Sequence, residues 1–314
     1  MGKSIYLVLM TFLCAASLAQ TASPPTSEKQ QLMRGKLEET IRDVDSRLDG
    51  VMGVSILDLT NGETITYHAD QVFPTASSIK VAVLAELYRQ TEQAEKGGRS
   101  AKLTDTYIFN KADDVPDSQI FNGLTPGVTK LTLRDVAQAM VAVSDNSATN
   151  VLIDRVGMQN VNELLQSLSL THTKLQRKMM DITAAKEGRE NLATPREFTM
   201  LLEAIYRGKL FNQQLTADYI KMLSTHKESP MRRALPDSVV VANKPGELDA
   251  VRNDIGIIYA PNRPFIISVM TSYLKNDREG EDAIGEITQA AYSYFDRLGR
   301  SSPYGRAMQP PAQP

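Results

Sequence analysis

Ser77 and Lys80 are three residues apart and form the first pattern in this sequence that could do chemistry. The residues that follow, 81–87, are mostly apolar, so we expect a helix that begins near Ser77. A spacing of three places both side chains on one face of that helix, within reach of each other. A serine hydroxyl becomes a useful nucleophile when a neighbour accepts its proton, and burial lowers the pKa of a lysine enough to allow this. The pattern predicts a serine nucleophile with a lysine base.

The start of a helix adds a second requirement of acyl-transfer chemistry. Its first backbone N–H groups are free, and they can stabilise an oxyanion that forms beside Ser77. The alternative is a serine that merely caps the helix. A second serine and lysine at the same spacing, Ser272 and Lys275, follow an apolar run typical of a strand. Residues three apart on a strand point to opposite faces, so we assign this second pair no role.

Composition limits the classes of function. The chain has 314 residues, of which 42% are hydrophobic and 23% charged, with a formal net charge of -2. This length can bury a large core, and the near-neutral charge without a basic run argues against a nucleic-acid partner. The three histidines lie at unrelated spacings, so we expect no metal and no cofactor. We expect a monomer.

The first residues have the layout of an export signal. Lys3 precedes an apolar run from Ile5 to Leu13, and small residues follow up to Ala19. We predict a signal peptide over 1–19, a secreted or periplasmic mature chain, and no stable membrane insertion after cleavage. An uncleaved anchor is the alternative. The only cysteine, Cys14, lies in this segment, so the mature chain would have none.

Strand patterns occur near both ends of the chain, and helical patterns lie between them. We expect a helix over 28–48, strands over 51–59, 63–68, 239–244, 253–259 and 264–271, and a closing helix over 280–298. One sheet completed from both ends, with a helical lobe inserted, is an α+β fold. We therefore predict a spacer over 20–29, a catalytic domain over 30–298 and a disordered, Pro-rich tail over 299–314. Within that domain the sheet lobe comprises 30–72 and 231–298, and the helical lobe 73–230.

Two further motifs follow the first. Ser144-Asp145-Asn146 opens a predicted helix, and Lys244-Pro245-Gly246 ends a predicted strand. In order and spacing, the three motifs resemble those of the class A β-lactamases and related penicillin-recognising serine enzymes, S-x-x-K, S-D-N and K-T-G. The resemblance extends over 30–298 and implies an antiparallel five-stranded sheet flanked by N- and C-terminal helices, with an inserted all-helical lobe.

The resemblance implies roles for the catalytic residues. Ser77 would attack a carbonyl carbon, and Lys80 would take its proton. Ser144 would relay a proton to the leaving nitrogen, and Lys244 would hold positive potential over the cleft.

The resemblance also implies the substrate contacts. Asn146 would bind Lys80 and a substrate amide, and the N–H groups of Ser77 and Glu247 would form an oxyanion hole beside Gly246. Arg252, on the next strand, matches a position from which some family members bind the substrate carboxylate.

The polar segment 171–193 is an Ω-type loop by its length and composition. In the family such a loop carries an arginine and, two residues later, a glutamate that activates the deacylating water. Here Arg177 is followed two residues later by Met179, whose thioether cannot accept a proton. Thr183 stands near the position of an asparagine that helps to hold the water, and Asn191 is a further site residue of the loop.

The third motif also departs from the family. Pro245 stands where the family has a threonine or serine whose hydroxyl contacts the substrate carboxylate, and proline supplies neither hydroxyl nor N–H. Proline is tolerated in an edge strand, which is where we expect this segment. The guanidinium fork of Arg252 could replace part of what that hydroxyl supplies in the family.

The sequence leaves two kinds of function open. One is a serine hydrolase that is acylated by β-lactams or related amides and esters and deacylates slowly. The other is a penicillin-binding or sensing module, or a D,D-peptidase-like enzyme, without significant β-lactam turnover.

Overall fold

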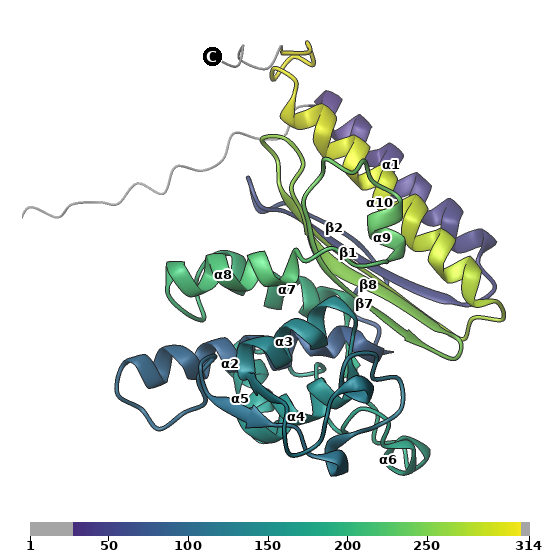
Figure 1. Cartoon of the computed structure of the whole chain (residues 1–314). Coiled ribbons are helices and arrows are strands. Elements are labelled where there is room, and N and C mark those ends of the chain that lie inside the picture. The colour runs from purple at the N-terminus through teal and green to yellow at the C-terminus, as the bar shows by residue number, and fades with distance from the viewer. Residues whose placement is uncertain (1–27, 309–314) are drawn as a thin grey trace, which may run out of the picture.

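The structure is a computed structural model, and it describes residues 28–308. The predicted signal peptide, its cleavage site after Ala19 and Cys14 lie outside the described residues. The described chain folds into a sheet lobe and a second, mainly helical lobe that lie against each other (Figure 1).

One antiparallel five-stranded sheet forms the centre of the first lobe, and its strand order is β2-β1-β9-β8-β7. The strands are β1 (Val51–Asp58), β2 (Thr64–Tyr67), β7 (Val241–Leu248), β8 (Val251–Ile258) and β9 (Phe265–Ser272). Strand β9 is buried at every position because helices cover both faces of the sheet, which explains its continuous apolar run. The predicted sheet, completed from both ends of the chain, is confirmed.

Two long helices lie side by side on the outer face of the sheet, α1 (Glu28–Arg47) and α10 (Asp277–Gly299) (Figure 1). Leu37, Ile41 and Val44 of α1 recur at helical spacing and join one buried cluster with Ile284 and Ile287 of α10. The short helix α9 (Pro230–Arg233) packs on α10, and α7 (Pro195–Tyr206) covers the other face of the sheet.

The second lobe surrounds a central helix, α2 (Lys80–Glu95), which is buried at twelve positions. Its other helices are α3 (Leu133–Ala142), α4 (Asn146–Val156), α5 (Met158–Ser167), α6 (Ile182–Lys186) and α8 (Gln213–Leu223), with the 3-10 turns η1 (Ala76–Ile79), η2 (Lys111–Asp113) and η3 (Phe121–Gly123). It also holds two short two-stranded sheets, β3 (Phe73–Pro74) with β6 (Leu192–Ala193) and β4 (Thr106–Ile108) with β5 (Lys130–Thr132). The prediction of an all-helical lobe was therefore wrong in this detail, because strands of two or three residues show no alternation to read.

Two boundaries also differ from the prediction. The Lys244-Pro245-Gly246 motif lies inside β7, whose pairing with β8 continues to Leu248, and does not end the strand. Part of the tail that we expected to be disordered is folded, since Ser301 pairs with Ala307 and Met308 N donates to Arg300 O at 2.7 Å. Gly305, at φ 83°, permits the turn between them.

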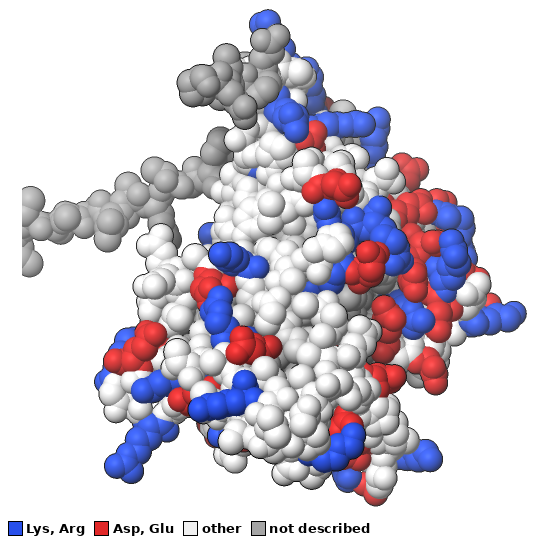
Figure 2. All heavy atoms as spheres, in the orientation of Figure 1, with Lys and Arg blue, Asp and Glu red and all other residues white. Residues whose placement is uncertain are grey.

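Charged side chains of both signs are intermixed over α1 and α10, and the rest of the visible face carries scattered charges (Figure 2). No basic patch dominates that face. Within residues 28–308, no helix is both long and apolar enough to span a membrane.

Candidate active site

Ser77 lies in the tight turn η1, directly before α2, where the sequence predicted the start of a helix. The preceding residue, Ala76, has φ 48°, a left-handed conformation that a non-glycine residue adopts at a cost when the surroundings fix it. Strand β7 lies against this turn, and Ser78 Oγ donates to Lys244 O at 3.1 Å. The edge strand thus holds the turn that carries Ser77 in place.

Gly246 shows how closely the two segments approach. A Cβ atom there would lie 2.6 Å from Thr75 O and 2.9 Å from Ser78 N, both backbone atoms that have little room to yield. We expect Gly246→Ala to displace β7 from Ser77 and lower the acylation rate by about 10²-fold, since catalysis is sensitive to misplacement on this scale. Stopped-flow acylation measures the effect. Gly123→Ala is the control because its Cβ would meet nothing within 4 Å; equal losses in both variants would contradict this role of Gly246.

Lys80, the first residue of α2, is 1% exposed. Its Nζ donates to Ser144 O at 2.6 Å, Ser144 Oγ at 3.0 Å and Asn146 Oδ1 at 2.9 Å. Burial lowers the pKa of Lys80 well below its ordinary value, the Lys244 cation lowers it further, and Asp145 partly opposes this. Lys80 therefore has the buried, low-pKa environment that a general base requires.

Ser144 is fixed by the turn between α3 and α4. Its φ is 58°, and the next residue, Asp145, is fully buried and caps α4 by accepting from Ala148 N at 2.9 Å. The second carboxylate oxygen of Asp145 accepts from the backbone N–H groups of Ile120 and Phe121. The helix predicted to open at this motif is thus capped by Asp145, and the Ser144 hydroxyl faces the two lysines.

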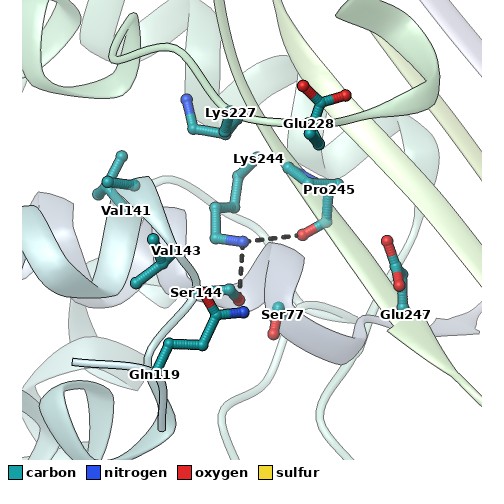
Figure 3. A pocket seen from close by; sticks show the side chains of 11 residues that line it. Ser77, Gln119, Val141, Val143, Ser144, Lys227, Glu228, Lys244, Pro245 and Glu247 are labelled. Carbon is teal, nitrogen blue, oxygen red and sulfur yellow. Dashed lines mark hydrogen bonds between the residues drawn. The ribbon is translucent and has the colours of Figure 1, made fainter. Parts of the chain in front are cut away.

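Lys244 reaches Ser144 from strand β7. Its Nζ donates to Ser144 Oγ and to Pro245 O, both at 3.0 Å (Figure 3). Burial lowers the pKa of Lys244 to about 7, helped by the charge of Lys227 and opposed by Asp254 and Glu247. The Ser144 hydroxyl thus bridges the amines of Lys80 and Lys244.

Lys227 is a residue that the sequence analysis missed. It is 7% exposed, its Nζ donates to Leu223 O at 2.7 Å and Thr225 O at 2.6 Å at the end of α8, and its stem lines the same cavity as Lys244. Burial lowers the pKa of Lys227 to about 8. A single lysine in a polar loop gives no sequence signal for this position.

Ser77 borders two cavities. The larger, of about 380 Å³, contains Ser144, Lys227 and Lys244, and it is also lined by Gln119, Val141, Ala142, Val143, Glu228, Pro245 and Glu247. The smaller, of about 120 Å³, contains Met179 and Asn146, and it is also lined by Ala76, Asp117, Arg177, Met180, Ile182, Asn191, Glu247 and Leu248. Most of the predicted site residues therefore line one cavity or the other. Lys80 lies just beneath this surface, bonded to Ser144, and Gly246 lies under the turn.

The Ω loop is fastened by two buried asparagines. Asn150 Nδ2 donates to Met179 O at 3.1 Å, and its Oδ1 accepts from Met179 N at 2.8 Å. Asn191 Oδ1 accepts from Arg177 N at 3.0 Å, and its Nδ2 donates to Arg177 O at 3.1 Å. Met179 is therefore held beside Ser77 by its backbone, while Thr183, in α6, lines neither cavity.

Arg252 is the predicted site residue that the structure does not place in the cleft. Its guanidinium faces α10, with Nη2 2.9 Å from Asp277 Oδ2 and Nε 3.4 Å from Glu281 Oε1, and it lines neither cavity. The expectation that it reaches a substrate carboxylate is not supported, because two carboxylates of α10 already hold it. Asp181, the carboxylate nearest to Met179 in the sequence, caps α6 and also lines neither cavity.

Comparison with known proteins agrees with this geometry. The model of the beta-lactamase enzyme family matches residues 36–295. The chain belongs to this family. Beta-lactamase SME-1 of Serratia marcescens is 25% identical over 94% of this chain and 100% of its own length, and the imipenem-hydrolyzing beta-lactamase of Enterobacter cloacae is 27% identical over 83% and 89%.

Solved structures give the same result for the fold. The beta-lactamase of Sphaerobacter thermophilus superposes with a TM-score of 0.73 at 32% identity, covering 82% of this chain and 95% of that one. PBP-A superposes with a TM-score of 0.74 at 24% identity, covering 84% and 97%, which shows a shared fold. The chain is thus a class A β-lactamase-like serine hydrolase by family and by fold.

For this family member we expect a pH effect on substrate binding. Lysine is charged below its pKa and neutral above it, so Lys244, with a pKa of about 7, loses its attraction for anions as pH rises. The KM for a carboxylate-bearing substrate should rise several-fold from about pH 6 to about pH 9, while the KM for a neutral ester changes little. Lys244→Arg should flatten this difference because arginine stays charged. If the KM values of both substrates changed with pH in parallel, this would contradict the role of the Lys244 charge in binding the carboxylate.

Proposed function

We propose that this chain is a secreted serine hydrolase that forms an acyl-enzyme on Ser77 with β-lactams or related amides and esters, and that hydrolyses it slowly. The observation that carries the proposal is the buried contact of Lys80 with Ser144 and Asn146, in a site where Met179 and Ser77 line the smaller cavity together. The segment over 1–19 supports export of the chain.

Acylation follows from the lysine–serine–lysine chain. Neutral Lys80 accepts the proton of Ser77 as its Oγ bonds to the carbonyl carbon. The N–H groups of Ser77 and Glu247 are our proposed donors to the developing oxyanion. The leaving nitrogen takes a proton from Ser144 Oγ, which contacts both amines at 3.0 Å and is reprotonated through them. The part of this route that joins Ser144 to the two amines thus runs between groups at hydrogen-bond distance.

Deacylation lacks an equivalent base. Met179 lines the smaller cavity beside Ser77, and the carboxylates that also line it, Asp117 and Glu247, are exposed. A general base contributes typically 10² to 10⁴-fold to such a step, so hydrolysis should be slower than acylation by about that factor.

Anion recognition comes from the larger cavity. Lys244 lies in it and the stem of Lys227 lines it, while Arg252 is bound to α10. A cleft with buried cations concentrates negative ligands, so we propose an anionic small-molecule substrate, bound by a monomeric chain.

The second candidate is a penicillin-binding or sensing module that is acylated without significant turnover. Met179 favours it, because a stable acyl-enzyme is the output that such a module needs. A D,D-peptidase-like activity is a further variant, although Pro245 supplies no hydroxyl in the edge strand.

A chromogenic cephalosporin tests the proposal. We expect an absorbance burst of about one equivalent of enzyme followed by a slow steady rate, since acylation outruns deacylation. A burst with no steady rate would favour the sensing module. Neither burst nor turnover, with intact Ser77 in a folded protein, would contradict both candidates.

A further inference from the structure

We propose that the end of the sheet lobe where α1 begins and α10 ends docks on the surface of an anionic phospholipid membrane. This goes beyond the proposed function and does not depend on it, because the cavities beside Ser77 share no residue with this end. The end lies away from the helical lobe (Figure 1). Six exposed or charged residues form what we call the terminal patch: Lys29, Leu32, Arg297, Tyr304, Arg306 and Met308.

The folded tail gives the terminal patch a defined shape. Residues 301–308 turn back on the end of α10, with Ser302 N donating to Arg306 O at 2.8 Å. Lys29 Nζ lies 3.5 Å from Tyr304 O, which joins the start of α1 to this turn. A cavity of about 170 Å³ lies between the turn and the two helices and is lined by residues of all three. The patch is therefore made by three segments that contact one another.

The terminal patch has an excess of positive charge. Its three basic residues are exposed, and within residues 28–308 none of them forms an ion pair. Of the acidic residues nearest to them along the two helices, Asp296 is already paired with Arg300 at 2.6 Å, which leaves Glu28 in the first turn of α1. Figure 2 shows basic side chains at the top of the view, beside the grey atoms. Each lysine or arginine near an anionic membrane strengthens binding roughly fivefold.

Exposed apolar side chains accompany these charges. Leu32 is 67% exposed, Tyr304 85% and Met308 58%. A tyrosine ring is amphipathic and prefers the boundary between water and lipid. Cations beside apolar groups favour a membrane interface over a soluble polyanion, because only the interface accepts both.

The order of the chain also favours a membrane as the occupant. Residues 1–27, which include the apolar run from Ile5 to Leu13, join the described chain at Glu28, beside the terminal patch. The predicted export segment is thus attached at the end that carries the exposed cations.

The test is cosedimentation of the full-length chain with vesicles at about 50 mM salt, where surface charge is weakly screened. Vesicles of phosphatidylcholine with one third phosphatidylglycerol should bind the protein about tenfold or more tightly than vesicles of phosphatidylcholine alone. The patch triple variant carries Lys29→Gln, Arg297→Gln and Arg306→Gln. It should bind the anionic vesicles about 10- to 100-fold more weakly than the unaltered protein.

A second triple variant is the matched control. Arg99→Gln, Lys102→Gln and Lys130→Gln remove the same charge from exposed positions of the helical lobe, and this protein should bind like the unaltered one. Any contribution of the apolar run is the same in all three proteins. Since the chain contains no tryptophan, Tyr304→Trp adds a single reporter, whose emission should move to shorter wavelength on the anionic vesicles.

Several results would overturn the inference. Equal weakening by the two triple variants would show that net charge, and not the terminal patch, controls binding. Unshifted emission from the Tyr304→Trp protein on the vesicles would show that the patch does not meet the lipid. Displacement by inorganic phosphate at constant ionic strength would assign the cavity to a free phosphate. A dimer in solution that the patch triple variant abolishes would assign the patch to a second copy of the chain.

Discussion

Ser77→Ala is expected to abolish covalent labelling by penicillin and by fluorophosphonate probes, lowering the acylation rate by about 10³-fold or more. Ser77 borders both cavities and shares the larger one with Ser144 and Lys244, and alanine removes the hydroxyl oxygen that would carry the acyl group there. Labelling is measured by intact-mass spectrometry, followed by mapping of the modified peptide.

Two outcomes around this variant are informative. Ser272→Ala is the matched control, because Ser272 and Lys275 repeat the serine–lysine spacing at the end of strand β9. The Ser272→Ala protein should be labelled to the same extent as the unaltered protein. An adduct that moves to Ser144 in the Ser77→Ala protein would contradict the assignment, because Ser144 would then be a competent nucleophile between the same lysines.

Met179→Glu should shorten the lifetime of the acyl-enzyme by about 10² to 10⁴-fold, because it places a base in the smaller cavity beside Ser77. Two hydrogen bonds with Asn150, one donated and one accepted by its side chain, fix the backbone of residue 179, so the new side chain should enter the same cavity. Adduct decay after removal of excess antibiotic measures the effect.

Met179→Gln is the control for this gain, since glutamine has the shape of glutamate without its basicity. Its adduct should decay as slowly as that of the unaltered protein. Equal acceleration by both substitutions would show that space, and not a base, limits hydrolysis, and it would contradict the role that we give to Met179.

The sequence was enough to predict the sheet and its flanking helices, and most of the residues that it singled out line the two cavities beside Ser77. Apolar runs such as β9 identify buried strands, and α1 shows its spacing of three and four directly. Ser77, Lys80 and Ser144 are found by their motifs because each motif belongs to one local turn, and a turn is specified by adjacent residues. The structure then brings the Ser144 turn to Lys80 through the packing of α2 on α4, and it brings β7 to Ser77 through the contacts of β7 with η1.

The remainder of the site depends on side-chain direction, which local sequence does not specify. Arg252 has the right place in the chain, yet Asp277 and Glu281, far away in sequence, attract its guanidinium to α10. Lys227 is buried because α8 ends beside β7, a tertiary arrangement that no short pattern encodes. The backbone of Met179 is fixed by two hydrogen bonds with Asn150, a residue 29 positions away that no short pattern connects to the loop.

Time-resolved intact-mass spectrometry of the unaltered protein mixed with penicillin tests the central claim most directly. We propose Lys80 as the base for acylation of Ser77, and a thioether lies in the smaller cavity where a base for hydrolysis would serve, so about one equivalent of adduct should form quickly and persist for minutes or longer. Peptide mapping should place it on Ser77. Rapid, sustained hydrolysis of the antibiotic with no detectable adduct would contradict this account, since another group, Glu247 or Asp117 of the smaller cavity, would then have to activate the water.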